Sequence, residues 1–80
     1  MKARVEVMLR EGVLDPQGEA VRHALASLGY DEVRGLRQGK LIEIDLEDGI
    51  DPQTARARVA EMCDKLLANT VVETFRIEID

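Results

Sequence analysis

The stretch LDPQGEAVRHALASLG, residues 14–29, carries both the start signal and the end signal of a helix. Asp15 suits the N-cap position because its carboxylate can accept hydrogen bonds from exposed backbone amides, and Pro16 needs no amide donor at the first helical position. Apolar residues then recur three and four positions apart until Gly29, which suits the left-handed position just past a helix end. The stretch therefore predicts a helix over residues 16–28.

Gly18 is the one residue of this stretch that capping does not explain. A glycine inside the first turn of a helix costs about 1 kcal/mol relative to alanine. Such a residue indicates that another backbone approaches closely. Gly18 could therefore admit the backbone of a neighbouring subunit, and an ordinary helix start remains the alternative. An anion site at the same helix start is disfavoured, because Asp15 already occupies it.

Alternating or apolar segments on both sides of this helix predict four strands. They cover residues 3–9, 32–37, 40–47 and 71–79, of which 32–37 is the weakest. Gly39 makes a turn between the second and third strands the expected connection. A second Asp-Pro pair, Asp51 and Pro52, starts another apolar helical stripe that ends near Asn69.

The order strand, helix, strand, strand, helix, strand predicts an α+β fold of the ferredoxin-like plait type. Such a fold has a four-stranded antiparallel sheet with two helices on one face. With 80 residues, the chain forms a single domain over residues 1–80. The uncovered second face of the sheet, with Met8, Leu41 and Val72 among charges, is then expected to meet another copy or a larger subunit.

Composition disfavours nucleic acid and membranes as partners. The net charge is −5, with eleven Lys and Arg scattered among sixteen Asp and Glu, so a phosphate backbone is repelled. Tyr30 and Phe75 are the only aromatic residues, too few for a base-stacking surface. No apolar run approaches the roughly 20 residues of a membrane span, and Cys63 has no cysteine partner. We expect a soluble, cytoplasmic protein without disulfides.

No set of residues in the sequence predicts catalysis, cofactor binding or metal binding. His23, the only histidine, is placed on the helix side opposite the apolar stripe, towards solvent or a partner. Cys63 lies at the edge of the second apolar stripe and is expected to be a small buried hydrophobe. The acidic run at residues 43–51 alternates with apolar residues as a solvated strand face does, and it lacks calcium-loop spacing.

Four motifs together resemble the PurS family, the small subunits of phosphoribosylformylglycinamidine (FGAM) synthase. They are GVLDPQG, LGY, VRGLRQGK and MCDKLLAN, and the resemblance extends over essentially the whole chain. One departure is Thr70, which stands after Asn69 where the family usually has proline.

The resemblance implies a non-catalytic subunit of an ATP-dependent glutamine amidotransferase and ligase complex in purine biosynthesis. It would bridge a glutaminase subunit, PurQ, and a synthetase subunit, PurL, and assist ammonia transfer between them. The resemblance also implies a homodimer or higher homo-oligomer. This subunit would bind no cofactor, while ATP and magnesium would be used by the synthetase partner.

Candidate partner contacts follow from the motifs and the loop. They are Asp15, Pro16, Gln17 and Gly18 in the loop, Arg37, Gly39 and Lys40 at the expected hairpin, and Asn69 after the second helix. Ordinary capping and solvated turn charges remain the competing explanation for these residues. A small-molecule-sensing regulatory domain of plait fold, binding an amino acid or nucleotide between the helices of a dimer, remains the alternative function.

Overall fold

The computed structural model describes residues 1–80 and contains one antiparallel sheet of three strands. The strands are β1 (Lys2–Leu9), β2 (Gly39–Asp45) and β3 (Glu73–Ile79), arranged in the order β2-β1-β3. Val5 in the central strand lies opposite Ile42 of β2 and Ile77 of β3. This register places most apolar residues of the three strands on one face of the sheet, while Met8 and Leu41 lie on the other.

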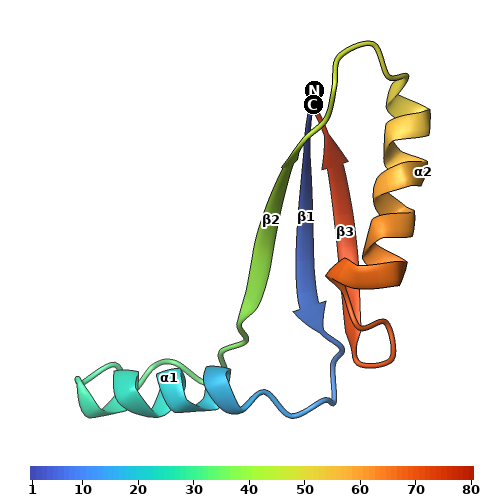
Figure 1. The fold of residues 1–80 in the computed structure, drawn as a ribbon. Helices are drawn as coiled ribbons and strands as arrows, with labels where there is room; N and C mark the ends of the chain where they lie inside the picture. The colour runs from blue at the N-terminus through green and yellow to red at the C-terminus, as the bar shows by residue number, and fades with distance from the viewer.

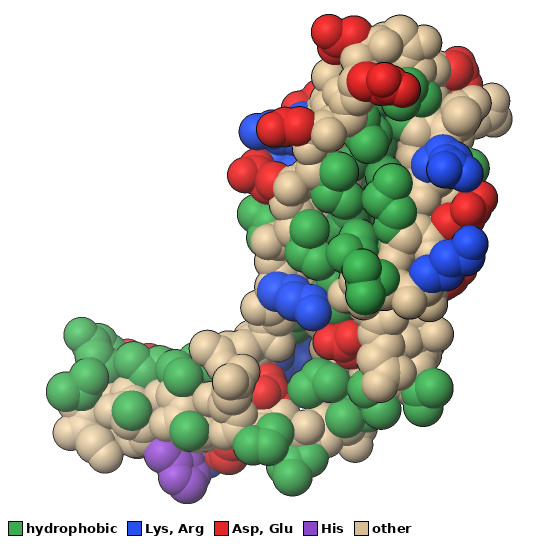
Figure 2. Space-filling view, viewed as in Figure 1, with side chains coloured by type: hydrophobic (Ala, Val, Ile, Leu, Met, Phe, Trp, Pro, Cys, Tyr) green, Lys and Arg blue, Asp and Glu red, His purple; other side chains and the backbone are tan.

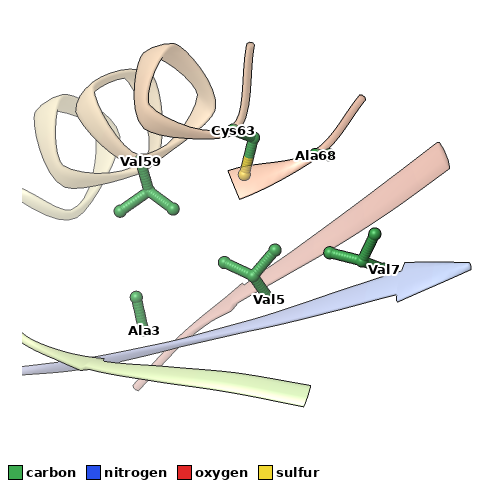
Figure 3. Close-up of a cluster of buried hydrophobic side chains, with 6 residues drawn as sticks. All are labelled: Ala3, Val5, Val7, Val59, Cys63 and Ala68. Atoms are coloured by element: carbon green, nitrogen blue, oxygen red, sulfur yellow. The ribbon is translucent and has the colours of Figure 1, made fainter. Parts of the chain in front are cut away.

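One helix covers part of that apolar face. Helix α2 (Pro52–Met62) continues into a π-helical turn, η1 (Cys63–Leu67), and packs along β3 (Figure 1). Asp51 caps it by accepting from the amide of Thr54 at 3.2 Å. The buried core lies between this helix and β1, as Figure 3 shows, and consists of Ala3, Val5, Val7, Val59, Cys63 and Ala68. Apart from the π-helical turn, the predicted second helix is confirmed.

Helix α1 (Pro16–Ser27) projects from the end of the sheet as an arm (Figure 1). Residues 28–38 run back beside it to the start of β2. The predicted bounds of this helix are confirmed, with Leu28 as the C-cap and Gly29 at a φ of 102°. The arm gives the chain a radius of gyration of 16.1 Å, whereas a compact domain of this length has about 12 Å.

The four-stranded plait predicted from the sequence is wrong in two respects. Residues 32–37 form no strand, because Val33 and Leu36 are three positions apart and would fall on opposite faces of a strand interrupted by Gly35. Without that edge strand, α1 has no partner strand beside it and does not cover the sheet. The observed order β2-β1-β3 is otherwise the order that the plait gives to its three remaining strands.

Gly39 also differs from its predicted role as the turn of a hairpin. It is the first residue of β2 and lies opposite Met8 of β1. A side chain there would overlap the Met8 side chain and the Val7 carbonyl oxygen. Gly39 therefore permits close approach of two strands and does not form a turn.

The sheet face opposite α2 is charged. Arg4 lies 3.4 Å from a Glu43 carboxylate oxygen and 3.1 Å from one of Asp80. Arg76 lies 2.9 Å from a carboxylate oxygen of Glu6. These exposed pairs place opposite charges on neighbouring strands and agree with the strand register. Neither of the helices is long and apolar enough to cross a membrane.

Candidate functional site: the elbow between arm and sheet

The arm meets the sheet at two crossing segments, residues 9–18 and residues 36–40, which we call the elbow. Asp15 connects them. One carboxylate oxygen accepts from the amide of Gly18 at 2.9 Å, and the other accepts from the amide of Gln38 at 2.9 Å. The first bond caps α1, and the second joins the helix start to the segment that enters β2. The same carboxylate therefore connects both segments of the elbow.

These contacts also shift the acidity of Asp15. The hydrogen bonds from the Gln38 and Gly18 amides favour the ionised form and hold the pKa of Asp15 below its ordinary value of 3.8. The nearby Arg37 guanidinium acts in the same direction, and desolvation opposes both. Asp15 is therefore an anion throughout the neutral pH range and keeps both acceptor oxygens available.

Gly18 is buried in the elbow, and the backbone that approaches it belongs to its own chain. A β-carbon on Gly18 would lie 2.8 Å from the carbonyl oxygen of Leu36 and 2.5 Å from a carboxylate oxygen of Asp15. The expected close approach is thus present, but the partner is residue 36 of the same molecule. Glycine at position 18 allows the two elbow segments to cross.

Arg37 adds a third tie between the segments. Its guanidinium donates to the carbonyl oxygen of Leu9, the last residue of β1. The end of β1, the start of α1 and the entry to β2 are therefore connected by side-chain and backbone hydrogen bonds. This fixes the direction of the arm relative to the sheet.

Two open depressions flank the elbow. The first, of about 310 Å³, is lined by eight residues that include Asp15, Gln17, Gly39 and Lys40. The second, of about 470 Å³, lies on the loop side and includes Val13, Leu14 and Arg37 among its lining residues. Seven of the eight residues proposed from the sequence therefore gather at the elbow, although they come from two separate motifs, residues 12–18 and residues 33–40.

Comparison with known proteins gives the family of this chain. The sequence profile of the family described as PurS: phosphoribosylformylglycinamidine (FGAM) synthase matches residues 2–80. The chain belongs to the PurS family. It is 49% identical over 79 residues to phosphoribosylformylglycinamidine synthase subunit PurS of Bacillus subtilis, covering 99% of this chain and 92% of that one.

Solved structures of PurS proteins share the fold. Methanocaldococcus jannaschii PurS superposes with a TM-score of 0.88 at 37% identity, covering 99% of this chain and 94% of that chain. A chain of PurLQS from Thermotoga maritima gives a TM-score of 0.76 at 29% identity, covering 96% of this chain and 93% of that chain. The three-stranded sheet with a projecting arm is therefore the PurS architecture.

Asn69, the eighth residue proposed, lies outside the elbow in the turn between η1 and β3. Its carbonyl oxygen accepts from the amides of Val72 and Glu73 at 3.0 and 2.7 Å. Its side-chain oxygen accepts from the amide of Val71 at 3.2 Å. Asn69 therefore shapes the turn that precedes β3 through its own hydrogen bonds.

Arg10 holds the turn around Asn69 in place, a role that the sequence did not indicate. Its guanidinium donates to the carbonyl oxygen of Thr70 at 2.8 and 3.3 Å, and its amide donates to that of Val72 at 2.8 Å. These bonds hold the turn around Asn69 against the end of β1. Only the pairing of β1 with β3 brings these segments together, so no local pattern could have shown it.

His23 and Cys63 lie in opposite surroundings, one exposed on the arm and the other buried in the core. His23 is 70% exposed and lies 3.4 Å from a carboxylate oxygen of Glu19. Cys63 is buried in the core. Desolvation is the main cause that raises the pKa of its thiol, and the negative charge of Asp64 adds to it. No three His, Cys, Asp or Glu side chains are grouped as metal ligands would be.

Proposed function

We propose that this chain is the non-catalytic small subunit of an FGAM synthase and joins a glutaminase subunit to an ATP-dependent synthetase subunit. The observation that carries the proposal is the match over 96% of the chain to a chain of the PurLQS structure. ATP and magnesium belong to the synthetase partner in this proposal. Neither the family match nor these relatives favour the small-molecule sensor that the fold alone would allow.

The physical reason for such a subunit lies in the chemistry of ammonia. Ammonia released into water becomes ammonium and loses its nucleophilic lone pair. A complex that holds the releasing site and the consuming site together avoids that loss and replaces a bimolecular encounter by a local transfer. A small chain with a rigid elbow can hold two larger subunits at a fixed distance.

The elbow is the proposed contact with a larger subunit, and the structure divides its residues into two groups. Asp15, Gly18, Arg37 and Gly39 are engaged in contacts within the chain. Gln17 and Lys40, which line the first depression, make no side-chain hydrogen bond or ion pair within the chain. Pro16 presents its ring at the helix start. We assign the partner contacts to Gln17 and Lys40, with the first group positioning them.

Reconstitution from separately purified glutaminase, synthetase and this chain tests the bridging role. We expect amidine formation from glutamine to need all three proteins, whereas formation from added ammonium salt needs only the synthetase, ATP and magnesium. Full glutamine-dependent activity without this chain would contradict the proposal. The ammonia-dependent reaction is the internal control, since it shows that the synthetase itself is active.

The elbow assignment has its own test. The double substitution Gln17→Ala and Lys40→Ala should weaken binding of the larger subunits without changing the unfolding temperature of the isolated chain. Lys65→Ala is the matched control, because Lys65 lies in η1 and lines neither depression. Equal binding by both variants would show that the elbow is not the contact surface.

The proposal also includes self-association of the chain. Only eight of the 80 residues are buried, a small core even for a domain of this size. Additional burial against another subunit would supply the missing stabilisation.

A further inference from the structure

Two loops at one end of the sheet present exposed apolar side chains. Leu14, in the loop between β1 and α1, is 77% exposed, and Val71, in the turn between η1 and β3, is 82% exposed. The two loops lie side by side where β1 ends and β3 begins (Figure 1). Figure 2 shows hydrophobic side chains gathered along this end of the molecule, below the sheet and beside the elbow. We call residues 10–15 and 69–72 together the loop surface.

Arg10 joins the two loops, although it lies 60 residues before Thr70 in the chain. Its guanidinium donates to the carbonyl oxygen of Thr70 at 2.8 and 3.3 Å, and its amide donates to that of Val72 at 2.8 Å. The two residues that carry these carbonyl groups flank Val71. One residue of the first loop therefore fixes where Val71 stands relative to Leu14.

Hydrogen bonds within each loop hold its shape. In the first loop the amide of Val13 donates to the carbonyl oxygen of Arg10 at 3.1 Å, and Asp15 closes the loop at the start of α1. In the second loop the side-chain oxygen of Asn69 accepts from the amide of Val71 at 3.2 Å. A loop that is already ordered loses less conformational entropy on binding. The exposed apolar side chains are therefore presented on a surface that is prepared for contact.

The depression of about 470 Å³ opens beside Leu14 and gives the loop surface a charged component. Both guanidinium groups that line it, those of Arg10 and Arg37, donate to carbonyl oxygens of their own chain. Glu11, which also lines it, makes no side-chain hydrogen bond or ion pair within the chain. An apolar side chain flanked by a lysine or arginine fits this surface, because the apolar part meets Leu14 and Val71 and the cation meets Glu11.

The size and position of the loop surface indicate what covers it. Two exposed aliphatic side chains and one depression make up only part of the ~800 Å² that each partner buries in a standard interface. The loop surface is therefore part of a larger contact. Asp15 lines both depressions, so the loop surface is continuous with the elbow, where Gln17 and Lys40 are the proposed partner contacts. A larger subunit that binds the elbow would reach the loop surface in the same contact.

We propose that the loop surface binds a larger subunit of the FGAM synthase, which places an apolar side chain flanked by a lysine or arginine against Leu14 and Val71. Arg10 is the positioning residue of this contact, because it holds Val71 beside the first loop without reaching the partner itself. The inference rests on the proposed function and adds to it a contact surface outside helix α1.

Titration of the chain against a mixture of purified glutaminase and synthetase tests the apolar contact. Leu14→Ser and Val71→Ser should each raise the dissociation constant at least about tenfold, as the loss of a central interface side chain does. Both positions are exposed in the isolated chain, so its unfolding temperature should stay the same. Leu66→Ser is the matched control and should bind as wild type does, because Leu66 is a similarly exposed leucine in η1 that lines neither depression.

Charge reversal tests the polar part of the contact. Glu11→Lys should weaken binding at low salt and should have a smaller effect at high salt, because salt screens the repulsion between exposed charges. Glu11→Gln, which only removes the charge, should have the smaller effect of the two. An effect of Glu11→Lys that does not change with salt would contradict a cation at this position of the partner.

A double-mutant cycle tests the role of Arg10. Arg10→Ala should weaken binding, and Val71→Ser should add little further loss in that background, because the turn is no longer held in place. Arg10→Lys keeps a donor for the Thr70 carbonyl oxygen and should retain part of the affinity. Losses that add fully would show that Arg10 does not act through Val71. Circular dichroism of each variant gives the control for folding.

The remaining outcomes separate this inference from the proposed function. Wild type that binds neither larger subunit would contradict both. Wild-type binding together with unchanged dissociation constants for Leu14→Ser and Val71→Ser would overturn the loop surface alone and leave the subunit role in place. In sedimentation of the isolated chain we expect both variants to keep the wild-type mass. A lower mass of these variants would assign the loop surface to a second copy and overturn the proposal.

Discussion

The carboxylate of Asp15 accepts a hydrogen bond from the amide of Gln38, 2.9 Å away and 23 residues later in the chain. Its other oxygen caps α1 through Gly18. Asp51, the other Asp-Pro helix start, accepts only from its own helix, at Thr54. The two Asp-Pro-Gln motifs are thus alike in sequence and different in structure, because only the first one joins two segments.

Asp15→Asn should loosen the elbow, whereas Asp51→Asn should have little effect. In Asp15 the two amides bond to two different carboxylate oxygens, and in asparagine one of these positions is an NH2 donor, so the Gly18 and Gln38 amides cannot both keep their acceptors. Hydrogen exchange of the Gln38 amide should become faster in Asp15→Asn. In Asp51→Asn, exchange at Gln38 should stay at the wild-type rate. Unchanged protection of Gln38 in both variants would show that this bond does not hold the elbow.

The elbow should also weaken in acid. The pKa of Asp15 is lowered in the folded chain, chiefly by the Gln38 and Gly18 amides, relative to the ordinary value of 3.8. A lowered pKa means that the contribution to stability is fully present above the ordinary pKa and is lost as pH falls through the folded one. We expect the difference in unfolding midpoint between wild type and Asp15→Asn to be constant from pH 7 to about 5 and to shrink below about pH 4. A difference that grew in acid would contradict this assignment.

The sequence predicted those features that local chemistry determines. Asp15, Pro16 and Gly29 defined α1 closely, and the alternation in residues 3–9 defined β1. The placement of α1 could not be obtained in the same way. It depends on hydrogen bonds between residues far apart in the chain, such as Arg37 with Leu9, and on the absence of an edge strand at residues 32–37.

The candidate site shows the same division. The motifs contain the elbow residues but do not show how they work, because the sequence suggests a partner contact for Gly18 and predicts a hairpin turn for Gly39. The structure assigns both glycines to close contacts within the chain, with Leu36 and Met8. A glycine in a sequence can indicate that another group lies too close for a side chain, but only the fold shows which group that is.

Gly18→Ala should destabilise the chain despite the better helix propensity of alanine. The propensity gain is about 1 kcal/mol. Overpacking against the Leu36 carbonyl oxygen, 2.8 Å from the new β-carbon, forces a backbone shift that costs typically 1–3 kcal/mol. The net change in the free energy of unfolding should therefore be destabilising by up to about 2 kcal/mol. Denaturant unfolding measures it.

Gly35→Ala is the matched control for this effect. Gly35 has no heavy atom within 4 Å of a β-carbon position and is not among the glycines with positive φ. Alanine there should be neutral or stabilise the chain by about 0.4–1 kcal/mol, because it restricts the unfolded state. Equal destabilisation by both substitutions would mean that crowding at Gly18 is not the cause.

The reactivity of Cys63 should report the opening of the core. The thiol is buried, and desolvation raises its pKa, so both access and thiolate formation are suppressed in the folded chain.

Val59→Ala removes two methyl groups from the same buried cluster and should lower the free energy of unfolding by about 2 kcal/mol. If labelling by a thiol reagent proceeds through the open state, this loss raises the labelling rate about 30-fold. Leu66→Ala, at an 83% exposed position, is the control and should label at the wild-type rate. Fast labelling of wild type in native buffer would contradict the burial of Cys63.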